Sequence, residues 1–223
     1  MERGLARQLS RPEGLPGRVV ARRLNRFNAG IVGEAVQATQ VGMGARVADV
    51  GFGGGVGLAQ LLKRVGPHGH VDGVELSVTM LAAARRRYAD ECARGRLHLH
   101  GGSITSLPLA DDSLDAVITV NTVYFVERLD LACAELARVL TPTGRAVIGI
   151  GDPDQMATLP FTAHGFRIRP VGEVAGALEE AGLTVNIVQV GHDDLLRHLL
   201  VGHRARTSRA ASVADEQEDP TGA

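Results

Sequence analysis

The stretch VADVGFGGGVG, residues 47–57, decides the fold. Its apolar first part runs directly into a loop that holds Gly51, Gly53 and Gly55, and an amphipathic helical pattern follows. Glycine has no Cβ atom, so such a loop can turn tightly and let a ligand contact its backbone. A strand, a glycine loop and a helix in this order place the loop at the carboxyl end of a strand, where open α/β sheets bind nucleotides.

The glycine spacing separates two classes of cofactor. The dinucleotide fingerprint is G-x-G-x-x-G, and its third glycine would fall on Val56 in the frame of Gly51 and on Leu58 in the frame of Gly53. The pattern that fits is D-x-G-x-G-x-G, which begins at Asp49. A turn without a ligand is the alternative, but four glycines cost backbone entropy without a compensating contact.

This motif resembles the first motif of the class I S-adenosylmethionine-dependent methyltransferases. The resemblance covers residues 42–204. Two further features carry it: Glu75 ends the next predicted strand, and ELARVLTPTGR (135–145) is similar to the helix, turn and strand of small-molecule members. The chain is identified as a member of the methyltransferase type 11 branch, similar to the ubiquinone and menaquinone biosynthesis enzymes. The resemblance implies a doubly wound, Rossmann-like α/β fold. Its seven-stranded sheet would be mostly parallel with an antiparallel C-terminal hairpin, and helices would cover both faces.

Hydrophobic periodicity predicts alternating strands and helices from residue 46 onward, which argues for a parallel sheet. The predicted strands are 46–50, 70–75, 96–100, 114–120, 145–150 and 183–190, and the predicted helices are 55–65, 78–93, 127–140 and 171–181. Pro142 and Gly144 form a stop after the third helix, and Ser77 is an expected N-cap. The pattern of residues 195–203 fits a helix or a strand, and the resemblance assigns 197–203 to a strand that pairs with 183–190.

Three segments divide the chain. Residues 1–40 form a basic N-terminal arm and a helix, predicted from Arg18 to Ala38, that caps the site. Their arginines form either a solvated face or a contact for an acidic substrate. Residues 41–204 form the methyltransferase domain, and the polar residues 205–223 are expected to be disordered.

Composition excludes several classes of function. The net charge of −1 and the absence of tryptophan argue against nucleic acid as a partner. No apolar run approaches a membrane span, so a cytoplasmic enzyme is expected, and a homodimer is compatible with the sequence. Cys92 and Cys133 are expected to be reduced packing residues. No metal site is predicted, because the histidines that alternate near strand ends have no cysteine partners; they are His68, His70, His98 and His100.

The family pattern assigns the cofactor site to the loops that follow the strands. Glu75 would accept hydrogen bonds from both ribose hydroxyls, and Leu76 would pack on the adenine. Ser103 stands where family members often carry an aspartate, and with the backbone of Ile104 it would contact the base edge. The backbone at Asn121 and Thr122 would meet the methionine end of the cofactor. The full set of expected cofactor-binding residues is Asp49, Gly51, Gly53, Gly55, Glu75, Leu76, Ser103, Ile104 and Asn121.

The acceptor side of the site is expected to be formed by Asn28, Tyr124, Phe125 and Phe166. Tyr124 is also a candidate catalytic residue, and His164 would act as a general base if the acceptor is a phenol or an acidic carbon. A hydrophobic seam is the alternative for the aromatic residues, and a solvated histidine is the alternative for His164. Asn-Thr-Val-Tyr at 121–124 lacks the prolines of base-directed amino-methyltransferases, which counts against DNA adenine methylation.

The sequence therefore predicts transfer of a methyl group from S-adenosylmethionine to a small organic acceptor by in-line displacement, mainly through positioning. Two alternatives stay open at this point. The first is an NAD-dependent oxidoreductase, which the failed third glycine disfavours. The second is a protein that binds S-adenosylmethionine without catalysis.

Overall fold

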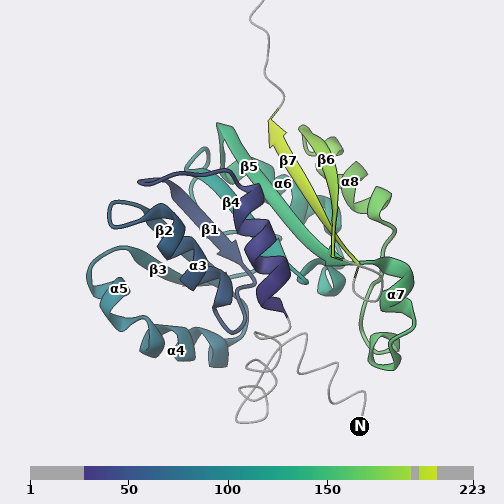
Figure 1. Ribbon diagram of the computed structural model, residues 1–223, viewed down its shortest axis with the longest axis horizontal. Coiled ribbons are helices and arrows are strands. Elements are labelled where there is room, and N and C mark those ends of the chain that lie inside the picture. Colours follow the sequence, from purple (N-terminus) through teal and green to yellow (C-terminus); the bar gives the residue numbers. More distant parts are fainter. Residues whose placement is uncertain (1–27, 192–195, 205–223) are drawn as a thin grey trace, which may run out of the picture.

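A seven-stranded sheet organises the residues that the structure, a computed structural model, describes: 28–191 and 196–204 (Figure 1). The strand order is β3-β2-β1-β4-β5-β7-β6. The strands are β1 (Arg46–Val50), β2 (His70–Glu75), β3 (Leu97–Gly101), β4 (Leu114–Val120), β5 (Leu140–Gly151), β6 (Leu183–Val190) and β7 (Arg197–Arg204). Strands β1 to β5 pair in parallel, whereas β7 is antiparallel to both of its neighbours. The expected mixed sheet with an antiparallel C-terminal hairpin is confirmed.

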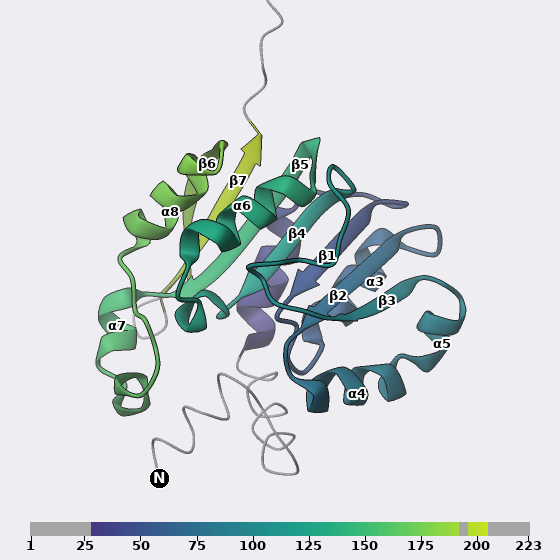
Figure 2. The same ribbon diagram turned by 180° about the vertical axis from the view of Figure 1, so that it is seen from behind.

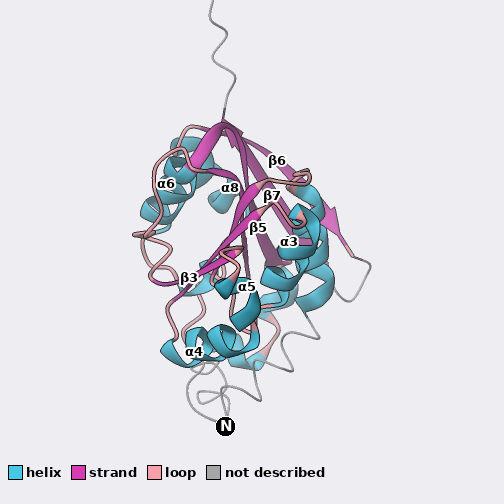
Figure 3. Cartoon of the chain, turned by 90° about the vertical axis from the view of Figure 1, so that its left-hand side faces the viewer, coloured by secondary structure: helices cyan, strands magenta, loops and turns pink. Residues whose placement is uncertain are grey.

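Helices cover both faces of this sheet, as the edge-on view shows (Figure 3). They are α3 (Val56–Val65), α4 (Val78–Arg87), α5 (Ala89–Ala93), α6 (Leu129–Val139), α7 (Pro153–Ala157) and α8 (Val171–Glu180), with the helical residues 28–38 and the short 3-10 turns η1 (Val123–Phe125) and η2 (Pro160–Ala163). The 28–38 helix and α3 lie in front of the sheet in Figure 1, and α6 and α8 lie in front of it in Figure 2, the view from behind.

Two apolar clusters hold these layers together. On one face, Leu136 of α6 and Leu178 of α8 pack in the same cluster as Ile148 of β5. On the other face, Ile31 of the 28–38 helix and Leu61 of α3 belong to the second cluster. Burial of aliphatic side chains on both faces is the main favourable term for a parallel sheet, which explains the apolar runs within the central strands β4 and β5.

The order of the strands creates a switch point between β1 and β4. From β1 the chain winds outward through β2 to β3, and then returns to the other side of β1 to continue through β4 and β5. The carboxyl ends of β1 and β4 are therefore adjacent while their following loops leave in opposite directions. Open α/β sheets bind ligands at such a point.

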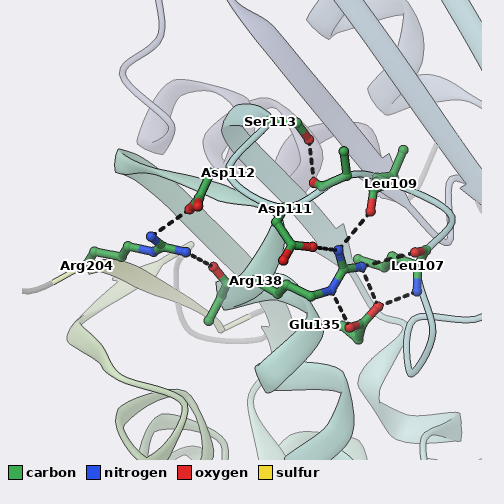
Figure 4. A network of polar contacts seen from close by, with 10 residues as sticks. Leu107, Leu109, Asp111, Asp112, Ser113, Glu135, Arg138 and Arg204 are labelled. Carbon is green, nitrogen blue, oxygen red and sulfur yellow. Dashed lines mark hydrogen bonds and ion pairs between the residues drawn. The ribbon is translucent and has the colours of Figure 1, made fainter.

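An arginine network ties the loop before β4 to helix α6 (Figure 4). Arg138 forms ion pairs with Glu135 and Asp111, and its guanidinium also donates to the carbonyl oxygens of Leu107 and Leu109 at 3.1 and 2.8 Å. One planar side chain with five N–H donors thus satisfies acceptors from two segments. The network fixes how the chain crosses from β3 to β4.

Several predicted boundaries shift in the structure. The helix expected over 78–93 is interrupted at Tyr88, which separates α4 from α5. The turn expected at residues 142–144 lies inside β5, where the register against β4 is irregular between Leu114 and Ala116. Ser77 is confirmed as the N-cap of α4, because its hydroxyl accepts a hydrogen bond from the amide of Met80.

Some expectations fall outside the described residues. These are the arm and the first part of the N-terminal helix (1–27), most of the turn at 191–194, and the polar tail 205–223. Within the described ranges, Cys92 and Cys133 are free, as expected. No helix in those ranges is both long and apolar enough to cross a membrane.

Candidate functional site

The loop after β1 contains three glycines in left-handed backbone conformations. Gly51, Gly53 and Gly55 have φ values of 74°, 50° and 78°. Residues with a Cβ rarely adopt such values, so the spacing seen in the sequence has a direct steric cause. The amide of Gly51 donates to the carbonyl of Val74 in β2 at 2.8 Å, and Gly55 is the residue that precedes the first turn of α3. The loop therefore carries the chain from β1 to α3 beside the end of β2.

Glu75, the last residue of β2, holds this loop in place. Its Oε2 accepts a hydrogen bond from the amide of Gly53, and its Oε1 accepts one from the amide of Ser77, both at 2.8 Å. Burial raises the pKa of the Glu75 carboxyl, while these backbone hydrogen bonds act in the opposite direction. Each carboxylate oxygen has a further lone pair, so Glu75 can still accept hydrogen bonds from a hydroxyl-bearing ligand.

Asp49 is a second buried carboxyl at the same edge of the sheet. Burial, together with the charge of Glu75, raises the pKa of Asp49 to about 8, although a hydrogen bond from the amide of Leu58 opposes the shift. A Cβ atom on Gly57 would collide with Asp49 Oδ2. Gly57 is thus needed for Asp49 to lie against the start of α3, a role that this glycine at the end of the 47–57 stretch could have revealed.

The end of β4 meets this loop from the other side of the switch point. Asn121 has a positive φ of 57°, and its side-chain Nδ2 donates to Oδ1 of Asn28 at 3.1 Å. Thr122 Oγ1 lies 3.5 Å from the carbonyl oxygen of Val50, the last residue of β1. The structure therefore brings Asn28, Asn121 and the glycine loop to one edge of the sheet. The backbone of Thr122 was expected at the methionine end of the cofactor, but its side-chain contact with Val50 was not predicted from the sequence.

The three residues expected to contact an adenine differ in their exposure. Leu76 is 55% exposed directly after Glu75, and Ile104 is buried in a core cluster. Ser103 Oγ lies 2.9 Å from Thr105 Oγ1, and it also accepts a hydrogen bond from the Thr105 amide. Leu76 and Ser103 follow neighbouring strands, β2 and β3, so their loops leave the same edge of the sheet.

The aromatic residues of the expected acceptor side lie together. The ring of Phe166 is 5.7 Å from that of Tyr124 and 4.6 Å from that of Phe125, between centroids, and Phe161 packs on Phe166 at 5.6 Å. The amide of Arg167 donates to the carbonyl of Tyr124 at 2.8 Å, which fixes the two segments to each other. We call Tyr124, Phe125, Phe161 and Phe166 the aromatic cluster.

Tyr124 is a buried phenol with a defined partner. Its hydroxyl oxygen accepts a hydrogen bond from the amide of Gly151, at the end of β5, at 2.7 Å. Burial raises the pKa of Tyr124 to about 12, and the charge of Asp152 adds to the shift. At neutral pH the side chain is therefore a neutral phenol. His164 lies half-buried directly after η2, in the segment that supplies Phe166.

The chain matches the sequence model of a known protein family. Residues 48–148 match the family model described as a methyltransferase domain, a span that runs from β1 into β5 and includes the glycine loop and Glu75. The match supports a class I S-adenosylmethionine-dependent methyltransferase domain over these residues. S-adenosylmethionine is the cofactor of that family, and the resemblance drawn from the first motif is confirmed.

Individual relatives agree with the family match. The chain is 38% identical over 187 residues to a protein described as "Uncharacterized 37.1 kDa protein in transposon TN4556" from Streptomyces fradiae, covering 76% of this chain and 53% of that protein. It is 34% identical over 131 residues to the ubiquinone/menaquinone biosynthesis C-methyltransferase UbiE of Methylobacterium nodulans, covering 56% of this chain and 50% of the enzyme. The chain thus spans about half the length of these two curated relatives.

A solved structure shows the same fold. A S-adenosylmethionine-dependent methyltransferase from Aquifex aeolicus superposes with a TM-score of 0.69 at 21% identity, covering 83% of this chain and 97% of that one. Both the strand order of this chain and its superposition on a solved methyltransferase support the class I methyltransferase fold.

Proposed function

We propose that this chain binds S-adenosylmethionine across the carboxyl ends of β1, β2 and β4 and transfers its methyl group to a small organic acceptor. The observation that carries the proposal is the pair of hydrogen bonds by which Glu75 holds the amides of Gly53 and Ser77 at 2.8 Å. They keep a carboxylate and a glycine loop side by side at the carboxyl ends of β2 and β1, as a nucleoside with two ribose hydroxyls requires.

The two buried carboxyls favour a cationic ligand. Asp49 and Glu75 interact unfavourably when both are charged, and burial disfavours the charge on each. S-adenosylmethionine carries positive charges on its sulfonium and on its ammonium group. A positive charge near Asp49 lowers the pKa of that carboxyl, so cofactor binding would release a proton from it at neutral pH.

The proposed contacts with the rest of the cofactor follow from the position of each residue. Glu75 would accept hydrogen bonds from the ribose hydroxyls, and the exposed side chain of Leu76 would pack on the adenine. The Ser103 hydroxyl and the Ile104 backbone would contact the base edge. The backbone at Asn121, whose side chain is held by Asn28, would face the methionine end.

When bound, the cofactor supplies a strongly electrophilic methyl group: a lone pair of the acceptor forms the new bond as the methyl–sulfur bond breaks, and that electron pair stays on sulfur. The chain's own contribution is to hold the two reactants in line, which can account for about 7–11 kcal/mol of barrier lowering. Tyr124 with its pKa of about 12 is suited to donate a hydrogen bond rather than to remove a proton. His164 is the proposed base for an acceptor that must lose a proton.

The aromatic cluster supports a small, partly apolar acceptor. Its rings come from η1 and from residues 161–166, and they border the segments that follow β4 and β5. Phe125 and Phe166 are partly exposed to solvent. Aromatic faces of this kind bind planar organic molecules. The relative from Methylobacterium nodulans is named for methylation of carbon in quinone biosynthesis. Quinols and phenols are therefore the first acceptors to test.

The first test is titration calorimetry of the full chain with S-adenosylhomocysteine, with NAD as a parallel ligand. We expect saturable binding of S-adenosylhomocysteine that weakens at least about tenfold in Glu75→Ala, because the ribose contacts and the support of Gly53 are lost together. The matched control is Glu179→Gln, which changes an exposed carboxylate on α8 and should bind as the unaltered chain does. Preference for NAD, or no binding of S-adenosylhomocysteine, would overturn the proposal.

A second measurement separates an enzyme from a binding protein. The folded chain is incubated with S-adenosylmethionine and a panel of phenols, quinols and small amines, and S-adenosylhomocysteine formation is followed by mass spectrometry. Turnover with any acceptor supports methyl transfer. Tight cofactor binding without turnover across the panel would favour the non-catalytic alternative.

A further inference from the structure

Three histidines and an aspartate gather at the β2–β3 edge of the sheet, away from the glycine loop. His70 and Asp72 belong to β2, and His98 and His100 belong to β3. Asp72 pairs directly with His98 across the parallel ladder. Because alternate residues of a strand share a face, all four side chains project from the same face of the sheet.

The spacing of three of these side chains suits a single metal ion. One ligating atom from each of His70, Asp72 and His98 lies within 4.8 Å of the other two. His70 Nε2 is 3.6 Å from Asp72 Oδ2. Two ligands that bind zinc at about 2.0–2.1 Å in a tetrahedron are about 3.4 Å apart, so this pair needs only a small adjustment to share an ion.

The hydrogen bond on the other side of the His70 ring determines which nitrogen is free to bind. His70 Nδ1 lies 3.1 Å from the carbonyl oxygen of Gly95. A carbonyl only accepts, so Nδ1 carries the hydrogen and Nε2 of the neutral ring presents a lone pair to Asp72. Metal-binding histidines are commonly oriented by this kind of contact with a backbone carbonyl.

The carboxylate of Asp72 is oriented in the same way. Its Oδ1 lies 2.8 Å from His100 Nε2, which leaves Oδ2 directed to His70. Asp72 is buried, whereas His98 is exposed and its ring centroid lies 4.3 Å from that of His70. The carboxylate of Asp72 and the imidazole of His70 are thus held by hydrogen bonds, whereas the imidazole of His98 faces solvent and can rotate to bind an ion.

We propose that His70, Asp72 and His98 bind a zinc ion, with water as the remaining ligand and with His100 and the carbonyl of Gly95 as orienting partners. Two imidazoles and one carboxylate are ligands of zinc rather than of magnesium or calcium, which prefer sites made of oxygen alone. The ion would join the edge strand β3 to β2.

This site is separate from the proposed cofactor site. His70 begins β2 and Glu75 ends it, so at about 3.3 Å per residue they are about 16 Å apart along the strand. The two side chains also alternate to opposite faces of the sheet. The expected role of the ion is therefore to stabilise the sheet edge, and methyl transfer should not depend on it directly.

The test is titration of the full-length, untagged chain with zinc chloride after removal of metals by a chelator. We expect one zinc ion per chain by calorimetry and by elemental analysis after dialysis, and a higher midpoint of thermal unfolding with zinc than with chelator. Cobalt(II) in place of zinc should give the visible absorption of a low-coordinate site with nitrogen and oxygen ligands.

Matched variants make the assignment specific. His98→Ala removes an exposed ligand and should weaken zinc binding at least about tenfold, and His70→Ala should do the same. His68→Ala removes an exposed histidine two residues before His70 and should leave zinc binding unchanged. Circular dichroism checks that each variant is folded. Absence of saturable binding to the unaltered chain, or equal binding by folded His98→Ala, would overturn the proposal.

Discussion

The side chain of Thr122 occupies the space that a Cβ atom on Gly51 would need: Thr122 Oγ1 would lie 2.5 Å from that atom. The two residues follow β4 and β1, the strands that border the switch point. The left-handed φ of Gly51 and the bulk of Thr122 therefore both require glycine here. The path of the loop is fixed by a neighbour about 70 residues away in the sequence as well as by local conformation.

Replacing Gly51 should damage both stability and cofactor binding. We expect Gly51→Ala to lower the free energy of unfolding by about 1–3 kcal/mol, because alanine is strained at this φ and collides with Thr122. The matched control is Gly176→Ala in the interior of α8, where a Cβ meets nothing within 4 Å. That change should raise the free energy of unfolding by about 0.5–1 kcal/mol. Urea unfolding of both variants checks the contrast, and equal effects would contradict it.

Asp49 should make stability depend on pH over the neutral range. Its pKa is raised from 3.8 to about 8 in the folded chain, so the native state keeps a proton that the unfolded chain has released. The free energy of unfolding therefore falls as the pH rises from about 4 to about 8. In Asp49→Asn this decrease of the free energy of unfolding with pH should disappear. Urea unfolding at several pH values measures it, with Glu179→Gln as the control, and an unchanged slope in Asp49→Asn would argue against a neutral Asp49.

Replacing Arg138 should lower the free energy of unfolding far more than replacing an exposed arginine does. Arg138→Ala removes the guanidinium donor from the carbonyls of Leu107 and Leu109, and it leaves the carboxylate of Glu135 with the Leu107 amide as its remaining donor (Figure 4). We expect a loss of about 2–4 kcal/mol in the free energy of unfolding. Arg128→Ala removes an exposed pair with Asp130 and should leave the free energy of unfolding nearly unchanged. Thermal or urea unfolding compares the two.

Tyr124 should ionise late in an alkaline titration. An exposed tyrosine is half ionised near pH 10, whereas burial raises the pKa of Tyr124 to about 12. The chain has two tyrosines, Tyr88 and Tyr124, and burial raises the pKa of both. Tyrosinate absorbance of the native chain should therefore rise only above about pH 10. Tyr124→Phe should remove the step that occurs at the higher pH. Because the native state retains this proton, stability falls as the pH rises from about 10 towards 12. A full tyrosinate signal at pH 10 in the folded chain would contradict the assignment.

The first half of the fold could be predicted closely because its signals are local. The bounds of β1, β2 and β4 were predicted correctly, since each is a short apolar run bounded by turn residues. The break at Tyr88 could not be predicted, because it accompanies a distant contact: the Tyr88 hydroxyl donates to the carbonyl of Gly55 at 2.7 Å. Residues 142–144 have the composition of a turn, but pairing with β4 draws them into β5 as an irregularity of the ladder.

The site was predictable where it depends on spacing and less so where it depends on register. The glycine motif placed Asp49 and Glu75 at the ends of neighbouring strands from sequence alone. The contact of Asn28 with Asn121 joins residues 93 apart, and the role of Thr122 depends on how β1 lies beside β4. The histidines near 70 and 98 alternate visibly in the sequence, but only the register of β2 against β3 brings them to Asp72. The sequence alone predicted no metal site at these histidines, and the zinc site proposed above depends on their gathering with Asp72.

The insertion of β7 between β5 and β6 has a consequence for the order in which the sheet can be completed. During synthesis β6 leaves the ribosome before β7, yet its only neighbour among the described strands is β7. Until residues 197–204 have emerged, β6 has no edge to join and β5 presents an open one. The growing chain can therefore assemble β1 to β5 early, whereas β6 can join the sheet only together with β7 or after it.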